Sequence, residues 1–228
     1  MTIPPPGWRE LREGLDPAIA ATPAPNGPVV PEPWVITPVL DHGPTLETVH
    51  RWLNGAANAA SYDQAWPIER MAEEMAYQHA GVYSRPFLIG TAERWLGFFE
   101  VYRAGRDIVA KTYQADPGDL GLHATLGVQD REARRVGRAM LKAVLDGLLV
   151  ANPDCRRVVA EPNASNRVVH LINRSIGFVE IGPIQLPHKK AILFAYPRTP
   201  EDLPTLLPPP ADAAGSAEAK AAEAAPAG

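Results

Sequence analysis

The sequence predicts a mixed α/β domain, and three features carry that prediction. Segments with strand patterns recur between segments whose apolar residues follow helical spacing. Two strand patterns, at 87–90 and 95–102, follow each other closely enough to form a hairpin. Further along, a strand at 120–128, a helix from 139 and a strand at 157–161 form one crossover unit. Strands and helices therefore alternate as they do when helices pack on a sheet.

The length and charge of the chain exclude several classes of protein. Its 228 residues are enough for one domain with a substantial core, and its 46% hydrophobic and 21% charged residues are ordinary for a soluble protein. The net charge of −4 argues against general binding of nucleic acids, which favours a basic surface. No apolar stretch is long enough to cross a bilayer, so we expect no membrane partner.

The cysteine and histidine residues bear on disulfides and metal sites, and the N-terminal residues bear on the cellular compartment. The single cysteine, Cys155, cannot form an internal disulfide, and no Cys/His cluster has metal-ligand spacing, so we expect no metal. Prolines 4, 5 and 6 interrupt any early apolar run of the kind that a signal peptide needs. The cytoplasm is therefore the expected compartment.

Proline marks both ends of the predicted domain. Residues 1–33 hold nine prolines, a density that excludes long helices and central strands, although Trp8 and Leu11 are able to dock on the body. Beyond Pro197 the chain is rich first in proline and then in alanine, and it lacks large apolar side chains after 207. We expect an arm at 1–33, a folded domain at 34–197 and a disordered tail at 198–228.

The first half of the domain begins with a strand at 34–39. Thr45 is then expected to cap a helix whose apolar face includes Leu46, Val49 and Leu53. Pro67 suits the first turn of a second helix, which carries an apolar face of its own, Ile68, Met71 and Met75. The hairpin at 87–102 follows.

The strand at 120–128 carries the first candidate functional residue. Its large apolar residues share one face, while His123 lies on the other between Gly121 and Thr125, an arrangement expected to leave room for a substrate. A histidine titrates near neutral pH and suits proton transfer. The alternative is a buried structural histidine, held by hydrogen bonds within the sheet.

The last third of the domain adds a strand, a helix and a final hairpin. The strand at 157–161 stops at Pro162, and a helix from about Asn166 to Ile176 ends at Gly177, which suits a C-terminal cap. Strands at 178–181 and 191–196 close the domain. His188 and the lysines that follow it are expected in the exposed turn between these strands.

A basic, glycine-containing turn is the second candidate site. We expect Arg134, Arg135, Val136, Gly137, Arg138 and Ala139 to open the helix that follows. The first N–H groups of a helix lack internal partners, and the helix dipole makes that end partly positive, so phosphate is favoured there. The turn fits neither a P-loop nor a dinucleotide fingerprint. Taken alone, the turn is equally consistent with a solvated arginine cluster.

In this strand-turn-helix context, the chain from about 85 to 196 resembles the GNAT superfamily of acyl-CoA-dependent N-acyltransferases. The resemblance implies a central, mostly antiparallel twisted sheet flanked by helices, with acyl-CoA as co-substrate. It implies that the backbone at 135–139 holds the CoA pyrophosphate. Val128 and its neighbouring backbone would carry the pantetheine arm, and Asn166 would begin a second cofactor-contacting segment.

Further motifs resemble one branch, the acyltransferases of hydroxamate siderophore biosynthesis. They are Gly97–Tyr102, Asp107–Val109, Tyr113–His123 and Glu161–Asn166. That branch acylates the side-chain nitrogen of lysine or N-hydroxylysine, so siderophore-pathway enzymes are expected partners. The resemblance implies His123 as catalytic base with Glu161 beside it. This chain departs from the branch in having Asn163 and Ser165 where an aspartate and an arginine are usual.

The acceptor is expected to be a small amine or hydroxylamine. The resemblance places the acceptor site near four residues, Trp66, Glu100, Tyr102 and Asn163. Acyl transfer from a thioester needs a neutral nitrogen and a group that receives its proton, which agrees with His123. Two alternatives stay open: another amine acceptor, such as an antibiotic, a polyamine or a protein N-terminus, and a CoA-binding module that has lost its chemistry.

Overall fold

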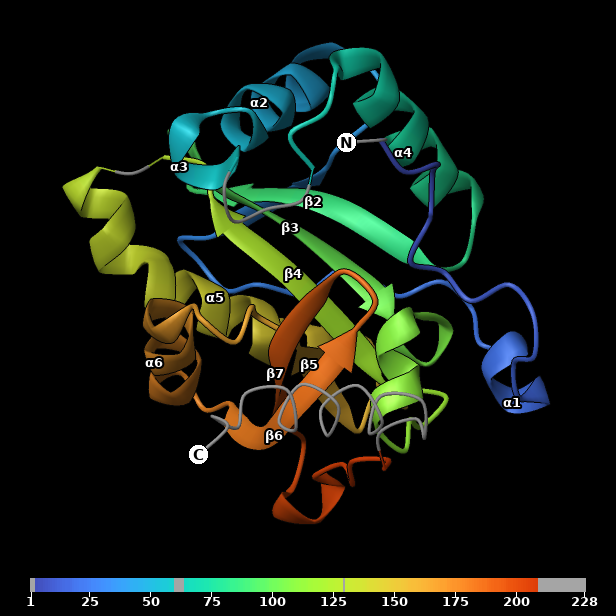
Figure 1. Ribbon diagram of the computed structural model, residues 1–228. Helices are drawn as coiled ribbons and strands as arrows, with labels where there is room; N and C mark the ends of the chain where they lie inside the picture. The colour runs from blue at the N-terminus through green and yellow to red at the C-terminus, as the bar shows by residue number, and fades with distance from the viewer. Residues whose placement is uncertain (1–2, 60–63, 129, 209–228) are drawn as a thin grey trace, which may run out of the picture.

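A single seven-stranded sheet organises the computed structural model, which describes residues 3–59, 64–128 and 130–208 (Figure 1). Its spatial order is β1-β2-β3-β4-β5-β7-β6. The strands are β1 Val35–Pro38, β2 Ser84–Gly90, β3 Trp95–Arg103, β4 Leu120–Leu126, β5 Arg157–Ala160, β6 Val179–Leu186 and β7 Lys189–Pro197. Every pairing is antiparallel except that of β4 with β5. The predicted mixed α/β class with a mostly antiparallel sheet is confirmed.

Helices cover both faces of this sheet (Figure 1). They are α1 Pro17–Ala20, α2 Gly43–Leu53, α3 Ala56–Ala59, α4 Ile68–Ala80, α5 Arg131–Ala151 and α6 Arg167–Ser175, with 3-10 turns at Ala104–Arg106, Ile108–Thr112 and Pro200–Asp202. Leu88 and Phe98 pack with α2 and α4, whereas Phe87 and Phe99 pack with α5. This alternation follows from the two-residue period of a strand, and it buries both faces of the hairpin. No helix within the described residues is both long and apolar enough to span a membrane.

The β4–β5 pair leaves part of the sheet open. Among the described residues, β4 pairs with β5 only at Leu120–Val158 and Gly121–Val159, although β4 continues to Leu126. The strand β5 stops at Ala160, and Pro162 soon afterwards has no N–H to continue a ladder. Beyond Gly121 the edge of β4 is therefore not paired with β5, although the Leu126 carbonyl accepts from Asn58 Nδ2 at 3.1 Å. The residue just after β5 is placed beside the middle of β4.

Several helix boundaries differ from the sequence predictions. Thr45 is not the cap of α2, because the helix begins at Gly43, after His42, and the Thr45 hydroxyl accepts the N–H of Leu40 at 3.2 Å. Pro67 is the residue that precedes α4 rather than a member of its first turn. The earlier start of α2 agrees with its proline at the second helical position, where proline is tolerated.

The predicted turn at 134–139 is part of a helix. Asp130 caps α5 by accepting the N–H of Ala133 at 2.8 Å, so the helix begins at Arg131. The six residues of the predicted turn therefore lie inside the first turns of α5, where most N–H groups bond to the helix itself. Gly137 faces Leu126 of β4, where a Cβ would make an ordinary contact at 3.4 Å.

The segments outside 34–197 are also packed where the structure describes them. The arm pairs with the segment after β3 through a bridge between Glu10 and Asp107, and Leu11 N–H donates to the Arg106 carbonyl at 2.7 Å. At the other end, Asp202 pairs with Arg156 at 2.7 Å. The boundaries predicted at 33 and 197 are therefore not edges of the packed structure. Residues 209–228, most of the predicted disordered tail, lie outside the described residues.

A buried ion pair joins β4 to β5 at the point where they are parallel. Arg157 Nε donates to Asp119 Oδ1 at 2.9 Å, and the two side chains are 7% and 0% exposed. Asp119→Ala leaves the arginine charge buried without its partner, so we expect the free energy of unfolding to fall by about 3–5 kcal/mol. Lys142→Ala breaks the exposed Lys142–Asp146 pair and should lower the free energy of unfolding by about 0.5 kcal/mol or less. Urea unfolding followed by tryptophan fluorescence measures both, and equal losses would contradict this account.

Candidate functional site

His123 and Glu161 meet at the point where β4 and β5 separate. His123 lies in the middle of β4, and Glu161 directly follows β5, so the parallel pairing brings them side by side. His123 Nε2 and Glu161 Oε1 are 2.6 Å apart. The carboxylate is buried, with 2% of its side chain exposed, and the imidazole is 14% exposed. The pairing predicted from sequence is therefore present as a direct hydrogen bond.

Tyr102 of β3 completes the support of Glu161. Its hydroxyl donates to Glu161 Oε2 at 2.8 Å, and its ring lies 4.7 Å from that of His123. Tyr102 reaches across β4 because Gly121 has no side chain, since a Cβ there would stand 2.0 Å from the tyrosine ring. Gly121 therefore makes room for Tyr102, not for a substrate. Thr125 also leaves no open space, because its hydroxyl donates to Asn58 Oδ1 at 2.9 Å.

Two cations from distant segments approach the same pair. Arg9, from the N-terminal arm, places Nη1 2.7 Å from His123 Nε2 and 3.9 Å from Glu161 Oε1. Lys189, at the start of β7, places Nζ 3.7 Å from the same carboxylate oxygen. The turn at 188–190 was predicted to be exposed, but Lys189 is 16% exposed and His188 packs edge-on against Trp8 at 4.9 Å. The correction follows from the arm, which covers this turn.

A small polar cavity lies beside His123. Its lining includes Arg9 and Trp8 of the arm, Glu100 and Tyr102 of β3, and the amide side chains of Gln64 and Gln78. The cavity measures about 20 Å³, room for about one water molecule. Gln64 Nε2 donates to Glu100 Oε2 at 3.1 Å and Gln78 Nε2 to Glu100 Oε1 at 2.7 Å. Both oxygens of this buried carboxylate are therefore held by amide donors.

The electrostatics of the pair place a proton on His123 and a charge on Glu161. Burial alone would raise the pKa of Glu161, but the charges of His123, Lys189 and Arg9 outweigh it and hold that pKa well below its ordinary value. Burial lowers the pKa of His123 and Arg9 lowers it further, but the carboxylates of Glu161 and Glu100 outweigh them and the pKa is raised. The site therefore favours a protonated imidazole beside a charged Glu161 carboxylate.

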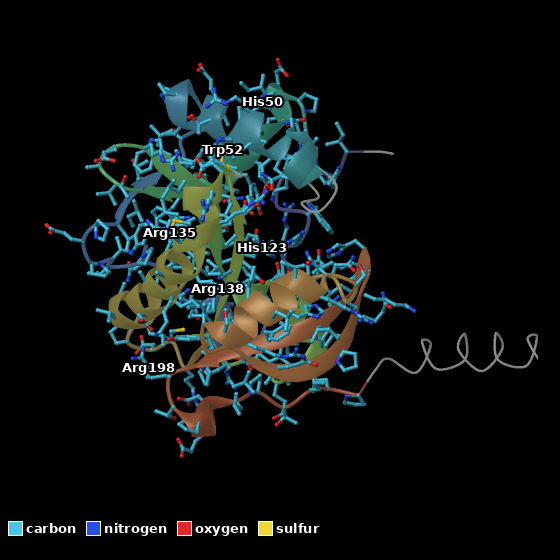
Figure 2. All side chains as sticks on the ribbon, turned by 90° about the vertical axis from the view of Figure 1, so that its left-hand side faces the viewer. His50, Trp52, His123, Arg135, Arg138 and Arg198 are labelled. Atoms are coloured by element: carbon cyan, nitrogen blue, oxygen red, sulfur yellow. The ribbon has the colours of Figure 1, made fainter. Side chains whose placement is uncertain are left out.

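Most of the residues predicted to hold a cofactor belong to the N-terminal half of α5, where Figure 2 shows Arg135 and Arg138. Arg134, Arg135, Arg138 and Ala139 are exposed, whereas Val136 and Gly137 are half-buried and face the core. Val128, just beyond β4, packs against the cores on both sides of the sheet. Asn166 caps α6, accepting the N–H of Val169 at 3.2 Å. The exposed arginines are thus available to an anion, and the cofactor role of this set stays a prediction.

The four predicted substrate residues separate into two groups. Glu100 and Tyr102 line the cavity. Trp66 is buried beneath Arg70, whose guanidinium carbon lies 4.3 Å from the ring centre, and it is not among the lining residues. Asn163 is exposed, and its Oδ1 accepts the Ser165 hydroxyl at 2.8 Å. The two residues that depart from the branch pattern therefore bond to each other.

Sequence reasoning missed Arg9, Lys189, Gln64 and Gln78. Arg9 is separated from His123 by 114 positions, and no local pattern marks a contact of that span. Gln64 lies in a connection between helices, and Gln78 faces inward among the polar residues of α4. The inward position of Gln78 is detectable in retrospect, because it lies three residues after Met75 on the buried stripe of the helix.

The arrangement is suited to proton transfer at a nitrogen. An ion pair with a hydrogen-bonded carboxylate exchanges protons over a short distance, and its surroundings are largely protected from water. No three of the described His, Cys, Asp and Glu residues are placed together to hold a metal ion. The one cysteine is unsuited to attack, because burial raises the pKa of the Cys155 thiol to about 12.

Comparisons with known proteins identify the family and the fold. Residues 42–186 match the family model described as an acetyltransferase (GNAT) domain. Lysine N-acyltransferase MbtK of Mycobacterium sp. (strain MCS) is 30% identical over 86% of this chain and 80% of its own length. N(6)-hydroxylysine O-acetyltransferase of Escherichia coli is 25% identical over 69% of this chain and 49% of its own length. Aminoglycoside acetyltransferase AAC(6')-Ib, solved with coenzyme A, shares the fold, with a TM-score of 0.60, 17% identity and coverage of 72% and 95%.

The packing of Tyr102 over Gly121 gives a test of the site. Gly121→Ala should displace the tyrosine ring from Glu161 and lower the free energy of unfolding by about 1–3 kcal/mol, the usual cost of overpacking. When Tyr102 has already been replaced by alanine, its ring no longer fills the space, so Gly121→Ala should leave the free energy of unfolding almost unchanged. A double-mutant cycle by urea unfolding measures this coupling. Additive effects would show that the two residues do not share the space.

Proposed function

The chain belongs to the GNAT acetyltransferase family, and from this premise we propose that it transfers an acyl group from acyl-CoA to the side-chain nitrogen of N6-hydroxylysine or a related diamine. The observation that carries the proposal is the buried His123–Glu161 ion pair beside the edge of β4 that is not paired with β5. The names of its relatives, which include lysine and hydroxylysine acyltransferases, support the choice of acceptor. The reaction belongs to the making of hydroxamate siderophores.

The edge of β4 fits the amide-bearing arm of coenzyme A. An unpaired strand edge offers N–H and C=O groups to an extended chain that carries amides of its own. The ring of Trp52 covers Gly127 at the end of this edge, since a Cβ on the glycine would stand 1.9 Å from it, and Val128 follows. The bound co-substrate supplies an acyl group activated as a thioester, and β4 would direct it toward His123.

The phosphates of the co-substrate are assigned to the start of α5. Because the helix begins at Arg131, the N–H groups at 135–139 are committed to the helix, and the pyrophosphate would instead rely on arginine side chains. Arg134, Arg135 and Arg138 are exposed there, and guanidinium groups bind phosphate oxygens strongly. Figure 2 shows Arg135 and Arg138 along α5, in the same view that shows His123.

The proton released by the acceptor passes to the His123–Glu161 pair. A hydroxylamine nitrogen is less basic than an alkyl amine and is mostly neutral at pH 7, so the pair need only receive the proton lost on attack. Because the pKa of Glu161 is held well below its ordinary value, the carboxylate does not keep that proton, and the pair passes on one proton for each one that it receives. His123 would supply a proton to the departing thiolate, which returns the pair to its starting state. We therefore infer direct transfer within a ternary complex, without an acyl-enzyme.

The acceptor assignment is tested by coenzyme A release. Purified protein is incubated with acetyl-CoA and N6-hydroxylysine, L-lysine, spermidine or kanamycin, and the free thiol is measured. N6-hydroxylysine should give the highest kcat/KM. His123→Ala should lower kcat by a factor of about 10²–10⁴, the usual share of a general acid–base group, and leave the KM for acetyl-CoA unchanged. His50→Ala, on α2, is the matched control and should retain full activity.

Two results would contradict the proposal. Equal or faster turnover of spermidine or kanamycin would remove the hydroxylysine assignment and favour another acceptor. Full activity of His123→Ala would remove the imidazole from the reaction.

A further inference from the structure

The arm fixes Arg9 beside the reacting centre. Gly7 N–H lies 3.2 and 3.3 Å from the two carboxylate oxygens of Glu74, and Ile108 N–H donates to the Arg9 carbonyl at 3.0 Å. Gly7 has a φ of +62°, and a Cβ there would stand 2.0 Å from the Tyr77 ring. The backbone on either side of Arg9 is therefore built into the domain, and the side chain extends from this fixed backbone to His123 and Glu161.

The surroundings of Arg9 require a positive charge. Glu161, Glu100, Glu74 and Asp107 are all buried, with between 1% and 4% of each residue exposed. Several buried carboxylates cannot be ionised together without cations close to them. The guanidinium of Arg9 supplies one such charge, and it interacts electrostatically with Glu161, Glu100 and Asp107.

Arg9 also occupies the place that an acceptor needs. Its Nη1 lies 2.7 Å from His123 Nε2, the same nitrogen that lies 2.6 Å from Glu161 Oε1. One imidazole nitrogen cannot donate to the carboxylate and accept from the guanidinium at the same time. The remaining cavity of about 20 Å³ holds one water and not an aminoalkyl chain. An acceptor therefore reaches His123 only after the Arg9 side chain has left.

We propose that Arg9 is a specificity-determining residue, which gives way only to an acceptor that brings a second, protonated nitrogen to Glu100. The reacting nitrogen must be neutral, so the class selected is a diamine or an amino acid side chain with a second, permanently protonated amine. Gln64 is 8% exposed, and its Oε1 lacks a hydrogen-bond partner among the described residues, so it is ready to accept an N–H of that ammonium. The inference rests on the proposed function for the reaction itself.

The test removes the competing cation and then restores it in solution. Arg9→Ala should lower the KM for N6-hydroxylysine about tenfold and leave the KM for acetyl-CoA unchanged. Methylguanidinium should then act as a competitive inhibitor against the acceptor in Arg9→Ala but not in the wild-type protein. It should also raise the Tm of Arg9→Ala alone. Arg12→Ala is the matched control, because Arg12 is exposed and lies over the Tyr77 ring. Arg9→Gln carries the same KM test should Arg9→Ala fail to fold.

Each contrary outcome has a defined meaning. A higher acceptor KM, or a kcat that falls more than tenfold and recovers with methylguanidinium, would overturn the inference and make Arg9 part of the binding or catalytic machinery. If Arg9→Ala leaves the KM for N6-hydroxylysine unchanged and methylguanidinium does not raise the Tm of this variant, Arg9 lies outside the acceptor site. If no amine is acylated by the wild-type protein, yet methylguanidinium stabilises only Arg9→Ala, the cation site stands and the proposed reaction fails.

Discussion

The charge on the buried carboxylate of Glu161 is the constraint on which the site depends. An ionised carboxylate removed from water costs several kcal/mol unless charges and hydrogen bonds replace its hydration. Glu161 obtains them from His123, Tyr102, Lys189 and Arg9. These partners come from two central strands, the final hairpin and the N-terminal arm, so one buried charge connects segments that are far apart in the chain.

The sheet provides the position for that charge. Because β4 and β5 are parallel at only two residue pairs, the residue after β5 reaches the middle of β4 while the rest of the β4 edge is not paired with β5. The ion pair and the unpaired edge are therefore consequences of the same divergence. A glycine at 121 then admits Tyr102 from the neighbouring strand. Backbone topology thus determines which side chains meet, and small residues determine how closely they approach.

Much of this could be predicted from the sequence, because the strong signals are local. The alternation around His123 gives its strand and its face, and the position of Glu161 before a proline gives the end of the next strand. The start of α5 was misplaced because Gly137 and its arginines suggest a turn, whereas Asp130 caps the helix earlier. Arg9 was not predictable in this way. It lies in a proline-rich segment without periodicity, and its role depends on contacts more than 100 positions away.

The most direct test of the central claim is the pKa of the His123 imidazole, measured by NMR titration of its ring carbon and assigned by comparison with His123→Gln. With the Glu161 carboxylate beside it, this pKa should lie above the ordinary value of about 6.5. In Glu161→Gln burial and the Arg9 charge still lower the pKa and only Glu100 still raises it, so the pKa should fall relative to the wild-type protein. A wild-type pKa at or below the ordinary value, or one that does not change in Glu161→Gln, would contradict the ion pair from which this account derives the reaction.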